Sequence, residues 1–108
     1  MKRGEVWWVQ FDPAIGSEIK KIRPAIIVSN NAANKHLARV VVVPLTSNTS
    51  RLYPGEAFVT IAGQKGKASA NQITTADKLR LKNQLATLSK EDMLAVEDAI
   101  LTHLGLPR

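Results

Sequence analysis

The stretch RVVVVPL at residues 39–45 decides the fold. It contains the run Val40 to Val43, whose β-branched side chains favour an extended backbone. A run that is apolar at every position has no obvious solvent face, so it predicts a central strand buried on both sides. Pro44 has no N–H to donate to a ladder, and we expect the strand to lose pairing or to bulge there.

Two further strands are predicted upstream of this stretch. Residues 5–11 read EVWWVQF, rich in β-branched and aromatic side chains, and Asp12-Pro13 stops the run. Apolar groups fall on both faces of that strand, which predicts burial on both sides or a contact in an oligomer. Residues 24–29 read PAIIVS and end at the turn signal Asn30-Asn31. A short helical turn is expected over residues 32–38.

Downstream, the sequence predicts a hairpin and a C-terminal helix. Residues 56–62 and 67–73 flank GQKG at 63–66, which we interpret as the hairpin turn. Ser89 is a good N-cap for the helix, and Gly105 with Pro107 ends it. The apolar stripe of this helix comprises Met93, Val96, Ile100 and Leu104. Short strands followed by one helix predict a mainly β fold, a small, partly open antiparallel barrel with a helix packed against it.

Composition limits what this chain can be. The 108 residues fit a single domain, residues 1–108, and they are 44% hydrophobic, which argues against disorder. The absence of cysteine excludes a disulfide scaffold, a thiolate zinc site and a thiol nucleophile. The apolar runs are too short to span a bilayer, and the first residues lack a signal-type stretch. We therefore expect a soluble cytoplasmic protein without membrane contact.

The charge of the chain is strongly positive. Lys and Arg number 15 against 9 acidic residues, a formal net charge of +6. The region from Ser89 onward is richer in acidic than in basic residues, so the positive charge is concentrated before it. Such a basic body suggests a polyanionic partner, namely RNA, DNA or an acidic protein. A solvated basic surface that serves only solubility is the alternative.

Two elements could carry chemistry on a phosphate. Arg23 directly precedes Pro24, which favours an extended backbone there and projects the guanidinium fork at the entrance of a strand. Thr46 and Ser47 follow the strand that Pro44 interrupts, where hydroxyl and N–H groups could contact an anion. The sequence contains neither a phosphate-binding loop nor residues at metal-ligand spacing, so neither a metal nor a cofactor is expected.

Taken together, these pieces resemble the MazF/PemK family of toxin endoribonucleases from bacterial type II toxin–antitoxin systems, over nearly the whole chain. The matching pieces are Arg3-Gly4-Glu5-Val6-Trp7, Gly16-Ser17-Glu18, Arg23 to Ser29, Pro44-Leu45-Thr46-Ser47, and Asn71-Gln72-Ile73 leading to Asp77-Lys78. Their order and spacing together make the resemblance specific.

The resemblance implies an SH3-like barrel of the CcdB/PemK type, a homodimer, and growth inhibition by cleavage of mRNA. It implies that single-stranded RNA is cut at short sequences without a metal, by attack of the ribose 2′-hydroxyl on the adjacent phosphate. The products would be a cyclic phosphate and a 5′-hydroxyl. A cognate antitoxin would neutralise the toxin, and we expect it to be acidic and disordered before binding.

The resemblance also assigns site residues. Arg23 and Thr46 match the catalytic pair of the family, and Glu18 and Ser47 match nearby positions. Arginine is a poor base because of its high pKa. Glu18 is therefore our candidate general base, and His36 is the alternative.

The RNA-binding residues are assigned in part by the resemblance and in part by charge. Gln72 and Asp77 match a region near the RNA site, whereas Thr74 stands where many members have arginine. The basic candidates for a surface shared by RNA and antitoxin are Lys20, Lys21, Arg23 and Lys78.

Two other functions stay open at this point. The first is a CcdB-like toxin that shares the barrel and helix but poisons DNA gyrase instead of cutting RNA. The second is a module that binds nucleic acid through its basic body without cleaving it. The Arg23-Pro24 and Thr46-Ser47 elements favour the nuclease.

Overall fold

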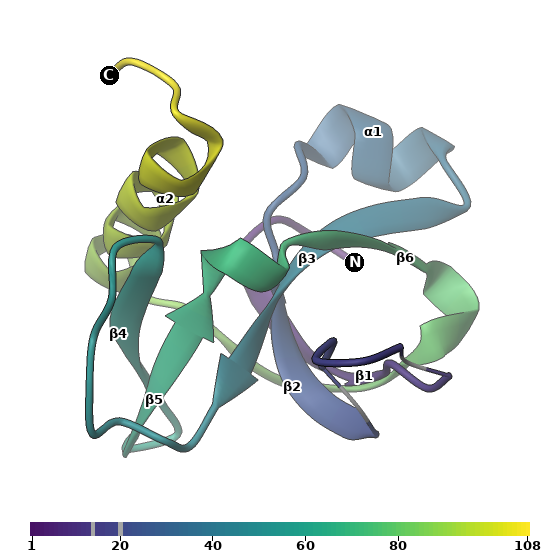
Figure 1. The fold of residues 1–108 in the computed structure, drawn as a ribbon. Coiled ribbons are helices and arrows are strands. Elements are labelled where there is room, and N and C mark those ends of the chain that lie inside the picture. Colours follow the sequence, from purple (N-terminus) through teal and green to yellow (C-terminus); the bar gives the residue numbers. More distant parts are fainter. Residues whose placement is uncertain (14, 20) are drawn as a thin grey trace.

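A bent antiparallel sheet curls into a half-barrel against one long helix in the computed structural model, which describes residues 1–13, 15–19 and 21–108 (Figure 1). The strands are β1 (Glu5–Gln10), β2 (Ile22–Ile27), β3 (Arg39–Thr46), β4 (Glu56–Ile61), β5 (Gln64–Ser69), β6 (Thr74–Asp77) and β7 (Leu81–Thr87). The helical elements are α1 (Asn31–His36), the short 3₁₀ turns η1 (Ala70–Gln72) and η2 (Lys78–Arg80), and α2 (Lys90–Leu104). The predicted barrel with a C-terminal helix is confirmed.

The central position predicted for residues 39–45 is confirmed, because β3 pairs with β2, β5 and β6. The strand order is β4-β5-β3-β2-β1-β7, and β6 lies beside the first half of β3. On that edge β3 pairs with β6 over residues 39–42 and with β5 from Leu45 onward. The break falls at Pro44, which cannot donate to a ladder. On the other edge Pro44 still pairs with Ala25 of β2, so the strand continues to Thr46.

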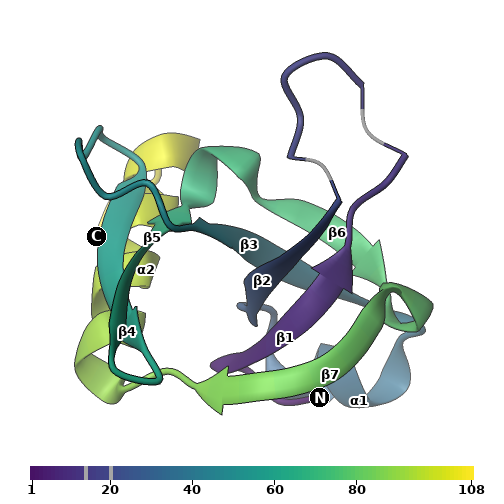
Figure 2. The same ribbon diagram turned by 90° about the horizontal axis from the view of Figure 1, so that it is seen from below.

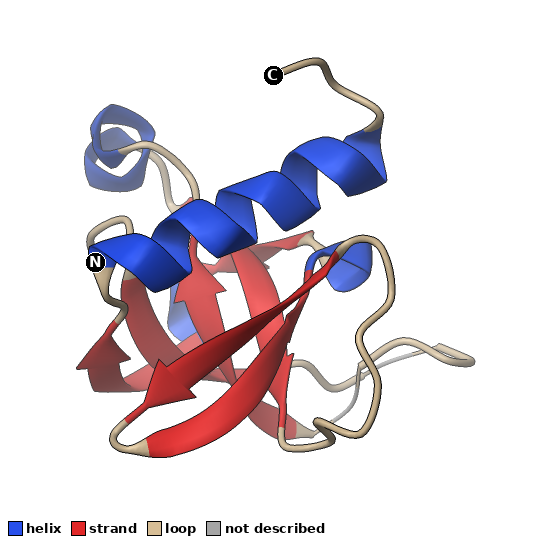
Figure 3. Ribbon diagram, turned by 90° about the vertical axis from the view of Figure 1, so that its left-hand side faces the viewer, coloured by secondary structure: helices blue, strands red, loops and turns tan. Residues whose placement is uncertain are grey.

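The core is divided between the two faces of the sheet. The larger cluster lies between the sheet and α2 and includes the fully buried Val6, Ile26, Val43 and Val96. Figure 3 shows α2 lying across the strands, and the apolar face of the helix closes that side of the half-barrel. A smaller cluster, which includes Val9, fills the opposite face.

The helix signals at the C-terminus are largely confirmed. The hydroxyl of Ser89 accepts the N–H of Asp92 at 3.1 Å, and Gly105 ends the helix with a left-handed φ of 68°. Met93 and Val96 of the predicted stripe are buried. The prediction that Leu104 belongs to the buried stripe is wrong, because this last residue of α2 is 52% exposed. No helix in the described ranges is long and apolar enough to cross a membrane.

The hairpin is confirmed, but its turn lies elsewhere. Ile61 pairs with Gln64, so the two-residue turn is Ala62-Gly63, with positive φ at both positions, rather than residues 63–66. Both central residues of a type I′ turn need positive φ, and this turn matches the twist of the strands. Residues 64–66 therefore belong to β5.

Two strands were missing from the sequence-based assignment. β7 has one strand neighbour, β1, and five of its seven side chains are exposed. An edge strand with a mostly polar sequence has no alternating pattern to reveal it. β6 has four residues and one buried side chain, Ala76. Both strands form because the backbone of β1 or β3 offers them a partner.

Replacement of Ile26 by alanine tests the packing of the larger core cluster. Ile26 is fully buried, so Ile26→Ala should lower the free energy of unfolding by about 2–5 kcal/mol through lost burial and a cavity. Urea unfolding followed by tryptophan fluorescence measures the change. The control Ile15→Ala removes a side chain that is 82% exposed and should change stability by less than about 0.5 kcal/mol. Equal effects of the two substitutions would contradict this core.

Candidate active site

The pairing of β2 with β3 brings Arg23 and Thr46 together. Ala25 pairs with Pro44 in an antiparallel register. Continued by two residues in each strand, this register sets Arg23 opposite Thr46. Both residues line one cavity of about 420 Å³, together with Ser47. We call it the Arg23 cavity.

The guanidinium of Arg23 has an unused hydrogen-bond donor. Its Nε atom is buried and makes no hydrogen bond within the described part of the chain. A buried donor without a partner costs about 1–3 kcal/mol of stability, so such groups are uncommon in folded proteins. Arg23 also lines the cavity, and a phosphate matches the fork of an arginine.

The hydroxyl oxygen of Thr46 is held by the loop that follows β3. The N–H of Asn48 donates to Thr46 Oγ1 at 3.3 Å. An oxygen that accepts one hydrogen bond from the backbone still has its own hydrogen to donate elsewhere. Thr46 is half-buried and the next residue, Ser47, is exposed, so both hydroxyls are accessible at the end of β3.

The rim of the Arg23 cavity is apolar. Trp8, Ile22 and Leu85 border it and are 36%, 49% and 38% exposed. They come from three neighbouring strands, β1, β2 and β7. Lys65 of β5 also lines the cavity and packs its ammonium 3.9 Å from the centre of the Phe58 ring.

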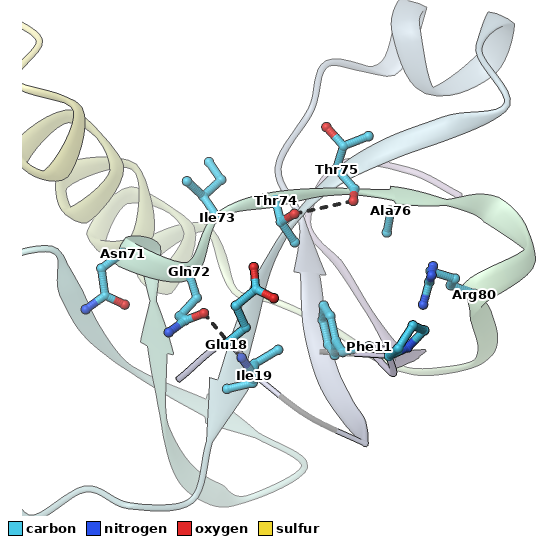
Figure 4. Close-up of a pocket in the computed structure, with 11 residues that line it drawn as sticks. Phe11, Glu18, Ile19, Asn71, Gln72, Ile73, Thr74, Thr75, Ala76 and Arg80 are labelled. Atoms are coloured by element: carbon cyan, nitrogen blue, oxygen red, sulfur yellow. Dashed lines mark hydrogen bonds between the residues drawn. The ribbon is translucent and has the colours of Figure 1, made fainter. Parts of the chain in front are cut away.

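Glu18 and Gln72 lie in a second cavity of about 450 Å³, shown in Figure 4. We call it the Gln72 cavity. Among the residues that the structure describes, the two cavities have no lining residue in common. The side-chain oxygen of Gln72 accepts the N–H of Ile19 at 3.4 Å, and Glu18 Oε1 accepts the N–H of Ile15 at 2.8 Å. Thr74 also lines this cavity.

Three further residues of the Gln72 cavity, Phe11, Asn71 and Arg80, were not among the predicted site residues. Arg80 donates to the backbone carbonyls of Gln10 and Asp12 at 2.9 and 2.8 Å, and thereby holds the start of the β1–β2 loop. Nothing in the sequence indicated this role for Arg80, because the residue lies on a short 3₁₀ turn that follows a strand that was not predicted. Phe11 could have been found, because it is one of only five aromatic residues in the chain and ends the first predicted strand.

Lys21 closes the base of the β1–β2 loop, which extends away from the strands (Figure 2). Its N–H donates to Asp12 Oδ1 at 2.9 Å, and its carbonyl accepts the N–H of Phe11 at 2.8 Å. The φ of Lys21 is 64°, in the left-handed region that favours glycine. Its side chain is exposed. Lys20, the other lysine predicted to bind RNA here, lies outside the described residues.

Asp77 and Lys78 line neither cavity, although Ala76 and Arg80 on either side of them line the Gln72 cavity. Asp77 pairs with Arg39, the first residue of β3, whereas Thr46 is the last. The carboxylate of Asp77 accepts the N–H of Leu79, and the ammonium of Lys78 donates to the carbonyl of Asn34. Their predicted RNA contacts stay predictions.

His36, the alternative general base, is an exposed residue at the end of α1 and lines neither cavity. Over the described ranges, no three His, Asp or Glu side chains are grouped closely enough to hold a metal ion.

Comparison with known proteins gives a consistent result. Residues 2–104 match the family described as "PemK-like, MazF-like toxin of type II toxin-antitoxin system". Endoribonuclease MazF9 of Mycobacterium tuberculosis is 37% identical over 115 residues, covering 98% of each chain. The CcdB-like alternative is therefore not favoured.

Solved structures agree in fold. A mycobacterial endoribonuclease in complex with its cognate antitoxin superposes with a TM-score of 0.84 at 32% identity, covering 100% of this chain and 98% of that one. MazF from Deinococcus radiodurans superposes with a TM-score of 0.87 at 27% identity, covering 98% and 97%. The family match and the relatives, together with the shared barrel, show that the chain belongs to the PemK-like, MazF-like toxin family and that its activity is that of an endoribonuclease.

Proposed function

We propose that Arg23 and Thr46 carry the endoribonuclease activity of this chain, acting on single-stranded RNA. The observation that carries the proposal is that Arg23 and Thr46 line the same cavity, while the buried Nε of Arg23 has no hydrogen-bond partner among the described residues. A scissile phosphate bound there would receive hydrogen bonds from the guanidinium and from the threonine hydroxyl. Both donors would stabilise the charge that accumulates on the phosphoryl oxygens in the transition state.

The proposed reaction needs no external nucleophile. The ribose 2′-oxygen forms a bond to the adjacent phosphorus, and the bond from phosphorus to the 5′-oxygen breaks. The proton of the 2′-hydroxyl passes to a base, and the leaving 5′-oxygen takes up a proton. The products are a 2′,3′-cyclic phosphate and a 5′-hydroxyl. Alignment of the attacking and leaving oxygens supplies much of the rate enhancement.

Glu18 is the general base that we propose. Glu18 lines the Gln72 cavity and not the Arg23 cavity, so this proposal requires the bound RNA to span both cavities and to bring its 2′-hydroxyl within reach of the Glu18 carboxylate. His36 lines neither cavity, and the carboxylate of Asp77 caps a backbone N–H. One oxygen of Glu18 accepts the N–H of Ile15, so the other is available for a proton. A carboxylate is also a far better proton acceptor than the arginine at physiological pH.

The Gln72 cavity is suited to nucleotides that flank the scissile phosphate. It combines the side-chain amides of Asn71 and Gln72 with the ring of Phe11. Unstacked RNA bases are bound by such pairings of hydrogen-bonding edges with aromatic faces. Ser47 lines the Arg23 cavity, and Lys21 is exposed directly before Ile22, which lines the same cavity. We assign both residues to the RNA backbone. Because mRNA is the proposed substrate, we place the protein in the cytoplasm.

Alanine substitution of Arg23 tests the catalytic assignment. Arg23→Ala should reduce kcat/KM by about 10²–10³-fold, the cost of losing one oriented donor to the transition state. Thr46→Ala should have a smaller effect. Both variants should unfold at denaturant concentrations close to those of the parent protein. Glu18→Gln should lower kcat if Glu18 is the base. The measurement is cleavage of a mixed single-stranded RNA pool, with mapping of the new ends.

The same assay tests the mechanism. Cleavage should persist in excess EDTA and leave 5′-hydroxyl ends. Loss of activity on chelation, restored by magnesium, would contradict the mechanism. RNA binding without new ends would favour the non-catalytic binding module. Cleavage by Arg23→Ala at the parent rate would remove Arg23 from the site.

The apolar rim of the Arg23 cavity leads us to propose a homodimer. Leu85→Glu should shift the protein toward monomer, because it places a charge on this rim where a second copy would cover it. The matched control is Leu94→Glu on α2, which changes a leucine that is 61% exposed and does not line the Arg23 cavity. Sedimentation velocity at micromolar concentration measures both. A stable monomer of the parent protein would contradict the proposal.

We also propose that a cognate acidic antitoxin occupies the RNA surface, as antitoxins accompany this family. Carboxylates of a segment that folds on binding would pair with Arg23 and with exposed lysines such as Lys21. A single-stranded RNA analogue lacking the reactive 2′-hydroxyl should bind without being cut and should compete with the antitoxin peptide. Fluorescence anisotropy with labelled RNA measures the competition. Simultaneous, independent binding would place the inhibitor elsewhere.

A further inference from the structure

One ion pair is buried beneath the loop that follows Thr46, outside both cavities. The ammonium of Lys67 on β5 lies 3.3 Å from the carboxylate of Glu56 on β4, and each side chain is 8% exposed. The other ion pairs within the described ranges are more exposed. Removing two charges from water is costly, so a buried pair of this kind adds little net stability unless it also organises its surroundings.

Both members of the pair hold the backbone of the loop of residues 47–55. Lys67 Nζ donates to the carbonyl of Arg51 at 3.0 Å. Glu56 Oε1 accepts the N–H of Tyr53 at 2.8 Å, while its Oε2 faces the lysine. The pair therefore anchors the loop at two points that lie two residues apart, and these bonds use the polar atoms of both side chains.

The anchor lies directly beside the proposed catalytic threonine. Thr46 is paired with Lys67 in the ladder between β3 and β5, so the two side chains lie on the same face of the sheet. Asn48 reaches the Thr46 hydroxyl from the loop through its N–H, and its side-chain oxygen accepts the N–H and the hydroxyl of Ser50 at 3.2 and 2.8 Å. Hydrogen bonds thus follow the loop from Thr46 toward Arg51, where the buried pair holds it.

We propose that Glu56 and Lys67 are positioning residues for RNA cleavage. Their ion pair fixes the loop so that Asn48 continues to donate to Thr46 Oγ1, and the threonine hydroxyl then directs its own hydrogen into the Arg23 cavity. The proposal rests on the function proposed above for Arg23 and Thr46. Catalytic groups need a supporting set of contacts that holds them within a fraction of an ångström, and this pair supplies it.

The test removes both charges together, because a lone buried charge would destabilise the fold. In the double variant Glu56→Gln/Lys67→Met, kcat on a fluorogenic RNA should fall between about tenfold and a hundredfold, as expected for a misplaced catalytic group. KM and the urea midpoint should change little. Trypsin should cut the native variant after Arg51 faster than the parent, because the carbonyl of Arg51 has lost its anchor. The single variant Lys67→Arg keeps a positive charge beside Glu56. Its kcat and its rate of trypsin cleavage after Arg51 should both match those of the parent protein.

The matched control is Glu97→Gln, which breaks the half-buried Arg3–Glu97 ion pair on α2 and should alter neither kcat nor cleavage after Arg51. Two outcomes would overturn the positioning role. The first is a double variant that trypsin cuts faster after Arg51 but whose kcat equals that of the parent. The second is a double variant whose cleavage after Arg51 is unchanged. If the double variant does not fold, Glu56→Gln/Lys67→Gln makes the same comparison, because it also removes both charges and the contact to the carbonyl of Arg51 while two amides can still hydrogen-bond to each other.

Trypsin cleavage involves no RNA, which separates this proposal from the proposed function. Full activity of Arg23→Ala would overturn the function proposed for the cavity and leave the loop measurement unaffected.

Discussion

The antiparallel register between β2 and β3 is the constraint on which the rest of the structure depends. The pair Ala25–Pro44 fixes it, and the same register sets Arg23 opposite Thr46 at the open end of the two strands. A slip by one residue would reverse which side chains face the core. Ile26 and Val43 would then leave the cluster under α2. Core packing and site geometry are therefore secured by the same set of hydrogen bonds.

Two features near the site lower the stability of the fold instead of raising it. Arg23 keeps a buried donor without a partner, and the β1–β2 loop closes on Lys21 in a backbone conformation better suited to glycine. Each costs stability in the free protein. The apolar packing on both faces of the sheet offsets that cost. An unpaired donor beside a cavity is preorganised, because no internal hydrogen bond has to break before an anion binds.

The loops at the ends of the strands are held by side-chain contacts to the backbone rather than by burial. Arg80 holds the start of the β1–β2 loop, and Gln72 contacts the same loop at Ile19. The loop after β3 is anchored by Lys67 and Glu56. A rigid barrel with loops fastened in this way can vary its loop residues and keep the Arg23 cavity unchanged. This division between scaffold and loops is common in proteins that bind variable ligands.

The sequence by itself determined the barrel, its central strand, the capped helix and the candidate pair Arg23 and Thr46. These features depend on local signals: a run of valines, Ser89 and Gly105 at the helix ends, and a proline after the arginine. It did not reveal β7 or the exact hairpin turn, because an edge strand takes its conformation from its neighbour. Only the tertiary structure decided that Glu18 and Gln72 line a cavity separate from that of Arg23, and that Asp77 and Lys78 lie at the far end of β3. It also brought Lys67 beside Thr46. Residues distant in the chain meet through strand pairing, and strand pairing depends on the packing of the whole sheet rather than on any local stretch of sequence.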